Sequence, residues 1–135
     1  MSDQYTFEIP VRYRDLDTYG HVNNAVYATY IEDARVNYLE DVVEPDRSAY
    51  GFVVANLQLS FERPVTLGER VVVTLETTSI GRTSVAQEYE LHADGELVAT
   101  GETTIVTVDP DEGRPVAVPD EVRTAVAAFE GREFE

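Results

Sequence analysis

The sequence predicts an α+β fold in which a five-stranded antiparallel sheet packs against one long helix. Three observations carry this prediction. One amphipathic segment with a helical period fills residues 24–43, segments of alternating apolar and polar residues lie on both sides of it, and tight-turn signals join the later segments. Because the chain has only 135 residues, we expect a single domain over residues 1–135.

The first strand is expected over residues 5–13, where apolar and polar side chains alternate. Pro10 indicates an edge strand or a bulge, because proline has no N–H for a sheet ladder. The helix follows over residues 24–43, where apolar residues recur at steps of three and four. Asn23 or Asn24 is expected to cap its start. Its apolar face consists of Tyr27, Tyr30, Ile31, Ala34, Tyr38 and Val42.

Four strands are expected after the helix. The clearest alternation spans residues 53–62 and predicts one buried apolar face and one polar face. Gly81 and the Asp94-Gly95 pair are turn signals between the later strands. The inward side chains are expected to be Val71, Val73 and Leu75 in the next strand and Val85, Tyr89 and Leu91 in the one after it. Residues 97–108 form the last strand, and a short helix is expected over residues 120–129.

The charge balance limits the partners of the chain. Its 26 acidic and 10 basic residues give a formal net charge of -16, which makes nucleic acid an unfavourable partner. All ten basic residues are arginine. This composition resembles that of proteins from salt-loving organisms, whose acidic surfaces are screened over about 3 Å in molar salt.

Other chemistries are excluded by composition. The chain has no cysteine, which rules out disulfides, thiol nucleophiles and Cys-bound zinc, and its two histidines argue against a His-rich metal site. No apolar run reaches the length of about 18 residues that a membrane span needs, and the first residues lack a secretory signal. We therefore expect a cytoplasmic protein that does not bind membranes.

The chemistry is concentrated in residues 15–27, which read DLDTYGHVNNAVY. Asp17 stands just ahead of the helix, where its carboxylate can act as a nucleophile or as a general base. The first backbone amides of the helix, around Asn23 and Asn24, have no intrahelical acceptor and carry the positive end of the helix dipole, so they can polarise a carbonyl group. Asp15 is the competing acid, and we expect it to fix the turn through Arg12 or Arg14.

This segment resembles the signature of the hotdog-fold acyl-CoA thioesterases, the 4-hydroxybenzoyl-CoA thioesterase-like family, in its long-chain branch. Residues 61–69, FERPVTLGE, are similar to the family's strand-end turn, and residues 80–85, IGRTSV, are similar to its later hairpin. The resemblance implies a sheet wrapped around one central helix. It also implies hydrolysis of acyl-CoA without a cofactor, CoA being part of the substrate, by a homodimer or homotetramer.

The same resemblance assigns roles to individual residues. It implies that Asp17 is the catalytic carboxylate and that the turn at Asn24 supplies the amide. Arg82 matches a position where relatives carry phosphate-binding residues, with Arg63 as a second possibility for the phosphates or as an ion pair. His21 is either a catalytic residue or a structural one.

Two further site residues have two interpretations each. Asn23 is either a helix cap or a support for catalysis, and Tyr27 lines an acyl pocket or packs in the core. Two other functions also stay open, an enoyl-CoA hydratase or dehydratase that uses Asp17 and His21, and a non-catalytic acyl-CoA binding module.

Overall fold

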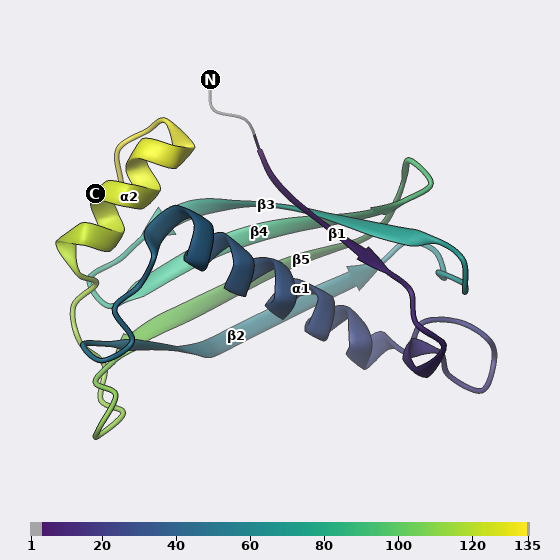
Figure 1. Ribbon diagram of the computed structural model, residues 1–135, viewed down its shortest axis with the longest axis horizontal. Helices are drawn as coiled ribbons and strands as arrows, with labels where there is room; N and C mark the ends of the chain where they lie inside the picture. Colours follow the sequence, from purple (N-terminus) through teal and green to yellow (C-terminus); the bar gives the residue numbers. More distant parts are fainter. Residues whose placement is uncertain (1–3, 135) are drawn as a thin grey trace.

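The computed structural model describes residues 4–134, and in it one curved antiparallel sheet holds a long helix against its inner face (Figure 1). In chain order the elements are β1 (Tyr5–Pro10), the 3-10 turn η1 (Tyr13–Asp15), α1 (Asn24–Tyr38), the π-helical turn η2 (Leu39–Val43), β2 (Gly51–Phe61), β3 (Arg70–Ile80), β4 (Ser84–Ala93), β5 (Glu96–Val108) and α2 (Asp120–Glu130). The predicted fold class, five antiparallel strands with one long helix, is confirmed.

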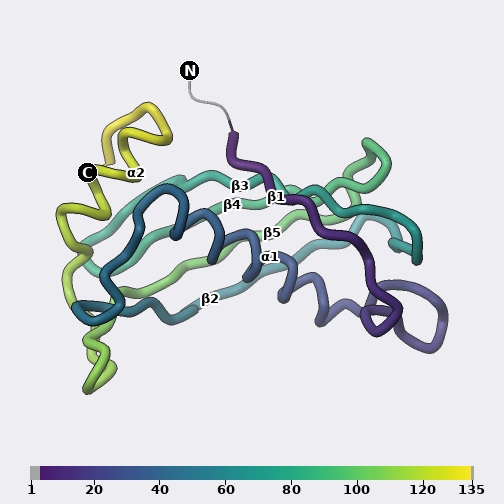
Figure 2. Tube along the Cα trace, viewed as in Figure 1, coloured from purple at the N-terminus to yellow at the C-terminus, as the bar shows by residue number. Residues whose placement is uncertain are grey.

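The strands lie in the order β1-β3-β4-β5-β2, and every neighbouring pair is antiparallel. β1 and β2 are therefore the two edge strands of the sheet, although they are consecutive strands along the chain, with η1, α1 and η2 between them. The chain passes from one edge of the sheet to the other along α1, which can be followed in Figure 2. Pro10 ends an edge strand, as predicted.

The core lies between α1 and the sheet. Of the predicted apolar face of the helix, the residues Tyr27, Tyr30, Ile31, Ala34 and Tyr38 are each at most 2% exposed. The sixth predicted residue, Val42, lies in η2 and is half-buried. The predicted inward side chains of β3 and β4 are buried against α1. α1 crosses β5 at Gly101, where an added Cβ would lie 2.7 Å from Ile31 Cδ1, so glycine permits the close approach of helix and strand.

One face prediction is wrong. β2 forms where the alternation predicted a strand, but the side chains that were expected to be buried are not buried in the protomer, and Val53, Leu57 and Phe61 are 49%, 42% and 43% exposed. The reason is topological, since β2 is an edge strand with a neighbour on one side only, and α1 packs mainly against β3 and β1. The first strand is also shorter than predicted, because η1 turns the chain soon after Pro10.

The turns and the last helix match the predictions. Asp94 and Gly95 both have positive φ, 51° and 78°, as a two-residue hairpin turn requires. The amide of Gly81 donates to the carbonyl of Ser84 at 2.7 Å and closes the preceding hairpin. α2 is fixed to α1 and to β3 through Glu130 Oε2, which accepts from the Tyr38 hydroxyl at 2.6 Å and from the Thr77 amide at 3.0 Å. No helix within residues 4–134 has the length and apolar character that crossing a bilayer requires.

Candidate active site

The loop before α1 is a closed, hydrogen-bonded turn. The Asp17 amide donates to the His21 carbonyl at 2.7 Å, and the Gly20 amide donates to the Asp17 carbonyl at 3.2 Å. Gly20 has a φ of 82°, a conformation that glycine adopts at little cost. Asp17 Oδ1 accepts from the amides of Tyr19 at 2.8 Å and His21 at 3.2 Å. Among the described residues nothing donates to Asp17 Oδ2, so one carboxylate oxygen is fixed and the other is available.

Asp15 has the structural role that was predicted for it. Its carboxylate Oδ2 accepts from the Arg12 amide at 2.9 Å and from the buried Tyr30 hydroxyl at 2.8 Å. Its carbonyl accepts from the Asn23 amide at 2.9 Å. Burial, followed by the hydrogen bond to Asp15, raises the pKa of Tyr30, which keeps this hydroxyl protonated as a donor. Asp15 thus joins η1, α1 and the loop, and its carboxylate is engaged in these structural hydrogen bonds.

The start of α1 leaves one amide without an acceptor. Asn23 is the N-cap, and its side-chain Oδ1 accepts from the Ala25 amide at 2.9 Å. The Asn23 carbonyl accepts from the Val26 amide at 2.8 Å. Asn24 is the first helical residue, where an amide has no intrahelical acceptor, and within residues 4–134 its N–H donates no hydrogen bond. This N–H carries the positive end of the helix dipole.

A cleft of about 270 Å³ brings four of the predicted site residues together: Asp17, His21, Asn24 and Tyr27. Tyr27 is 2% exposed and packs edge-on against Phe61, with ring centroids 5.0 Å apart. A further wall of the cleft was not predicted from the sequence, apart from Arg63, which was considered for the phosphates. It is the end of β2 and the turn after it, with Phe61, Glu62, Arg63 and Pro64. The similarity of residues 61–69 to a family turn was the signal that could have pointed to this wall.

Arg63 is a wall residue that is already engaged. Its guanidinium pairs with Glu69 at 3.0 Å and donates to the Ala93 carbonyl at 3.0 Å. The hydrogen bond from Arg63, with help from the Thr66 amide, lowers the pKa of Glu69 to about 2. Of the two roles considered for Arg63, the structure therefore has it as an ion pair, made within its own protomer.

Two predicted residues lie outside the cleft. Asn23 does not line it and serves as the helix cap. Arg82 follows the end of β3, whereas the cleft lies near its start, since His21 bridges Thr66 just before that strand. The 11 residues of β3 span about 35 Å, so Arg82 cannot reach the cleft of its own protomer.

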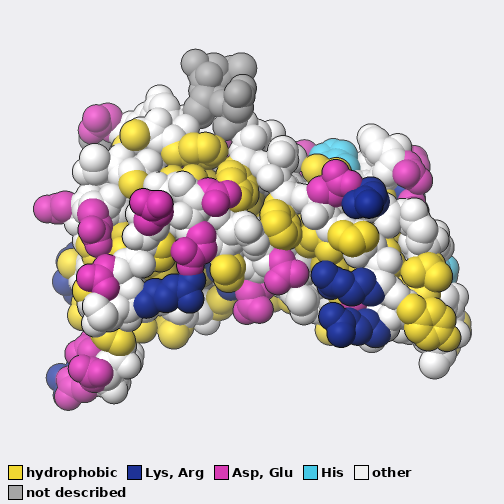
Figure 3. Space-filling view, viewed as in Figure 1, with side chains coloured by type: hydrophobic (Ala, Val, Ile, Leu, Met, Phe, Trp, Pro, Cys, Tyr) yellow, Lys and Arg dark blue, Asp and Glu magenta, His cyan; other side chains and the backbone are white. Residues whose placement is uncertain are grey.

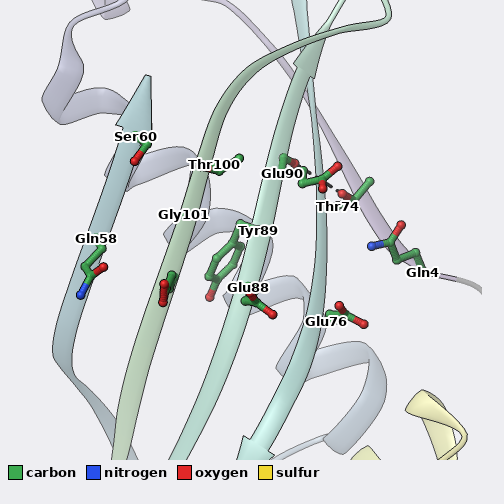
Figure 4. Close-up of a pocket in the computed structure, with 11 residues that line it drawn as sticks. Gln4, Gln58, Ser60, Thr74, Glu76, Glu88, Tyr89, Glu90, Thr100 and Gly101 are labelled. Carbon is green, nitrogen blue, oxygen red and sulfur yellow. Dashed lines mark hydrogen bonds between the residues drawn. The ribbon is translucent and has the colours of Figure 1, made fainter. Parts of the chain in front are cut away.

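A second hollow, of about 250 Å³, lies on the outer face of the sheet and has a different character. Glu76, Glu88 and Glu90 project there from β3 and β4, with α1 on the far side of the sheet (Figure 4). Glu88 lies directly opposite Glu76 on one side and Glu102 on the other, so three carboxylates stand in a row across three strands. In the part of the chain that the structure describes, no group of three or more acidic, His or Cys residues is arranged to hold a metal ion.

Comparison with known proteins shows which family this chain belongs to. A model of the thioesterase-like superfamily matches residues 11–126. The chain belongs to the thioesterase-like superfamily. This membership confirms the predicted enzyme class, thioester hydrolase.

Individual members are similar over nearly their whole length. The long-chain acyl-CoA thioesterase FadM of Escherichia coli is 31% identical over 86% of this chain and 92% of that protein. The acyl-CoA thioester hydrolase YbgC of Shigella flexneri is 31% identical over 91% of this chain and 95% of its own. A thioesterase from Thermus thermophilus, solved with coenzyme A and zinc, is 38% identical, has a TM-score of 0.85, and matches over 96% of both chains.

Proposed function

We propose that this thioesterase-superfamily member is a cytoplasmic acyl-CoA thioesterase that hydrolyses the thioester to a free carboxylic acid and CoA without a cofactor. The observation that carries the proposal is local. Asp17, with one unengaged carboxylate oxygen, and Asn24, with an unengaged first-turn amide, line the same cleft. An acid and a preorganised N–H donor beside one cavity are the two elements that acyl transfer to water requires.

In the proposed reaction, the thioester carbonyl oxygen accepts the Asn24 N–H while the carbonyl carbon is attacked. Asp17 Oδ2 either takes a proton from the attacking water or attacks the carbon itself, forming an anhydride that water then hydrolyses. In both routes the C–S bond breaks, CoA leaves as a thiolate and receives a proton, and the acyl group gains the hydroxyl of water.

The other predicted residues support these two groups. His21 lines the cleft, and its amide and carbonyl hold the Asp17 turn closed. We assign its imidazole to contact with the thioester or with water. Tyr27 forms the apolar floor where the acyl group begins. Asn23 acts through the cap, because it fixes the first turn of α1 and so the direction of the Asn24 N–H.

The proposal includes a homodimer joined along β2. The exposed apolar residues of this edge strand, with an unpaired ladder beside them, are the kind of surface that a second copy covers. In an antiparallel seam the Gly51 end of one strand lies beside the Phe61 end of the other. The turn at Arg82 is at the Gly51 end, since Thr107 donates to Thr83 and Gly51 pairs with Val108. The partner's Arg82 would then lie at the cleft end, within reach of CoA phosphates.

The proposed homodimer is tested by Leu57→Glu, which places a charge in the seam between the two β2 strands without touching the cleft. We expect the variant to be a monomer by light scattering and to lose acyl-CoA hydrolysis, while the wild type is a dimer or a tetramer built from such dimers. A variant that keeps the wild-type mass would contradict the seam. Arg82→Ala is expected to weaken CoA binding and to leave hydrolysis of a truncated thioester unchanged.

We further propose that the protein works in molar salt. Support comes from the net charge of -16 and from the row of carboxylates on the outer face of the sheet, where like charges directly opposite one another destabilise a sheet. Screening by salt removes this repulsion. An undiminished circular dichroism spectrum in dilute buffer would contradict the proposal.

The function itself is tested by following free CoA release from short, long and aromatic acyl-CoAs in molar KCl. Asp17→Asn keeps a side-chain oxygen for the turn but loses the base, and we expect release to disappear. Product analysis separates hydrolysis from hydration of an enoyl-CoA. CoA binding without turnover in the wild type would instead indicate an acyl-CoA binding module.

The amide can be tested separately, because proline is well tolerated at the first position of a helix. Asn24→Pro deletes the N–H together with the side chain, and Asn23 already has the extended backbone, φ -62° and ψ 136°, that a residue before proline prefers. We expect kcat to fall by roughly 10²- to 10³-fold, as for the loss of an oxyanion donor. Asn24→Ala retains the N–H and is the matched control, with kcat close to that of the wild type.

A further inference from the structure

Two exposed arginines, Arg12 and Arg14, lie beside the Asp17 loop and are not engaged in ion pairs among the described residues. The ion pairs of the described residues use the arginines 35, 47, 63, 70 and 114. Arg123 and Arg132 donate to backbone carbonyls of the β3–β4 hairpin. Arg12, Arg14 and Arg82 are exposed, and within residues 4–134 none of them has a carboxylate within 4 Å of its guanidinium. Of these three, Arg12 and Arg14 lie beside the Asp17 loop, whereas Arg82 follows the far end of β3. Figure 3 shows dark-blue side chains close together over the end of the molecule that carries η1.

Two tyrosines accompany these arginines and are nearly fully exposed. Tyr13 is 81% exposed and Tyr19 is 84% exposed, the highest values among the exposed large hydrophobic side chains of the described chain. Tyrosine buries an apolar ring when it can, and the tyrosines of α1, Tyr27, Tyr30 and Tyr38, do so. An exposed aromatic ring next to unpaired cations is a composition typical of a ligand surface rather than of a solvated turn.

The backbone under this surface is fixed before any ligand arrives. Asp15 caps η1 through the Arg12 amide and holds the Tyr30 hydroxyl. The Tyr19 amide donates to Asp17 Oδ1, so the ring of Tyr19 is carried by the same turn as the catalytic carboxylate. Because the loop is already ordered, a ligand that binds it pays little for ordering it.

We propose that Arg12, Tyr13, Arg14 and Tyr19, here called the Arg–Tyr surface, bind the phosphorylated adenosine part of the CoA substrate. This inference rests on the proposed function and extends it. The two guanidinium groups hold phosphate oxygens, which arginine binds bidentately, and Tyr13, which stands between them in sequence, stacks on the adenine ring.

The position of the surface fits the substrate. Arg14 is three residues from Asp17, so their Cα atoms are at most about 11 Å apart. The thioester would occupy the cleft, and the pantetheine arm would lead from it over the loop to the Arg–Tyr surface. On a protein with a net charge of -16, a phosphorylated ligand is repelled almost everywhere else, so local cations at the entrance also select where it lands.

The test compares substrates that differ only in the nucleotide. We expect the double variant Arg12→Gln/Arg14→Gln to raise KM for an acyl-CoA by roughly ten- to hundredfold, the scale for losing charge-assisted hydrogen bonds, with kcat unchanged. The same variant should hydrolyse the corresponding acyl-pantetheine thioester as well as the wild type. Tyr13→Ala should raise KM for acyl-CoA alone by a smaller factor.

The matched control is Arg47→Gln/Arg114→Gln, which removes the same two charges from exposed side chains away from η1, 72% and 78% exposed. Its KM for acyl-CoA should stay at the wild-type value. An unchanged KM in the Arg12/Arg14 variant, an equal rise in the control, or an equal loss on the pantetheine thioester would each overturn the inference.

A binding measurement separates failure of this inference from failure of the proposed function. Calorimetry with free CoA needs no turnover. If the wild type hydrolyses nothing but binds CoA more tightly than the Arg12→Gln/Arg14→Gln variant does, the surface is supported and the hydrolase proposal is not. If the wild type hydrolyses acyl-CoA and the variant binds CoA equally well, the Arg–Tyr surface is refuted alone.

Discussion

The contact between α1 and β5 at Gly101 sets where the helix lies, and it can be tested by adding one methyl group. In Gly101→Ala the new Cβ would stand 2.7 Å from Ile31 Cδ1 and 3.2 Å from Leu59 Cδ2. Carbon atoms pack best at about 3.5–4.0 Å, so Ile31 or the helix must move by about 1 Å. Ile31 is fully buried and has little room to yield. Overpacking of this kind costs about 1–3 kcal/mol, and we expect Gly101→Ala to lower the free energy of unfolding by that amount.

A double-mutant cycle measures whether the clash is the cause. Ile31→Val removes Cδ1 and alone should cost about 0.5–1.5 kcal/mol. In the Gly101→Ala background the same change relieves the clash, so we expect it to be neutral or stabilising, as measured by urea unfolding in molar KCl. Gly51→Ala is the control, because its Cβ would meet only Val108 Cγ2 at 3.8 Å. An equal cost of Ile31→Val in both backgrounds would refute the argument that α1 rests on β5 at this point.

Three further predictions concern the wall, the sheet and the helix cap. The pKa of Glu69 is lowered from 4.5 to about 2, so its contribution to stability is complete above pH 4.5 and disappears as pH falls through about 2. We expect Glu69→Gln to cost about 2–3 kcal/mol at pH 7, with a difference from the wild type that shrinks between these two pH values in urea unfolding. Glu88→Gln should stabilise the fold by roughly 0.2–1 kcal/mol in dilute buffer and by less in molar KCl, whereas Glu133→Gln, an exposed residue outside the sheet, should show no such salt dependence. Asn23→Ala should lower the free energy of unfolding by about 1 kcal/mol and so lower the thermal midpoint, while Asn23→Asp retains the cap. Equal midpoints for the two variants would contradict the capping role.

The elements with local signals were predictable from the sequence. The helix follows from the three- and four-residue spacing of its tyrosines, and the last hairpin follows from Asp94-Gly95, since periodicity and turn chemistry are set by neighbours in the chain. The cap at Asn23 was predictable for the same reason, because a cap satisfies amides two residues away.

The features that depend on sheet order were not predictable. Alternation along β2 indicates a strand but not its position at an edge, so the exposure of Leu57 and Phe61 could not be read from it. The separation of Arg82 from the cleft also follows from the direction of β3, which the sequence alone does not give. Asp15 and Asp17 have the same side chain in one short motif, and only the fold turns Asp15 toward Tyr30 and leaves Asp17 at the cleft.

The two groups assigned to the chemistry arise in the same way from a short stretch of chain. The Asp17 turn engages Oδ1 with two amides and leaves Oδ2, and the cap of α1 engages the amides of Ala25 and Val26 and leaves that of Asn24. Neither group is buried, so both are open to a ligand that presents an acceptor to the amide and an electrophile or a proton to the carboxylate. A thioester carbonyl with its attacking water meets both requirements. Because the turn and the cap are joined through the Asp15 carbonyl and the Asn23 amide, the two groups keep a fixed separation, as electrostatic preorganisation requires.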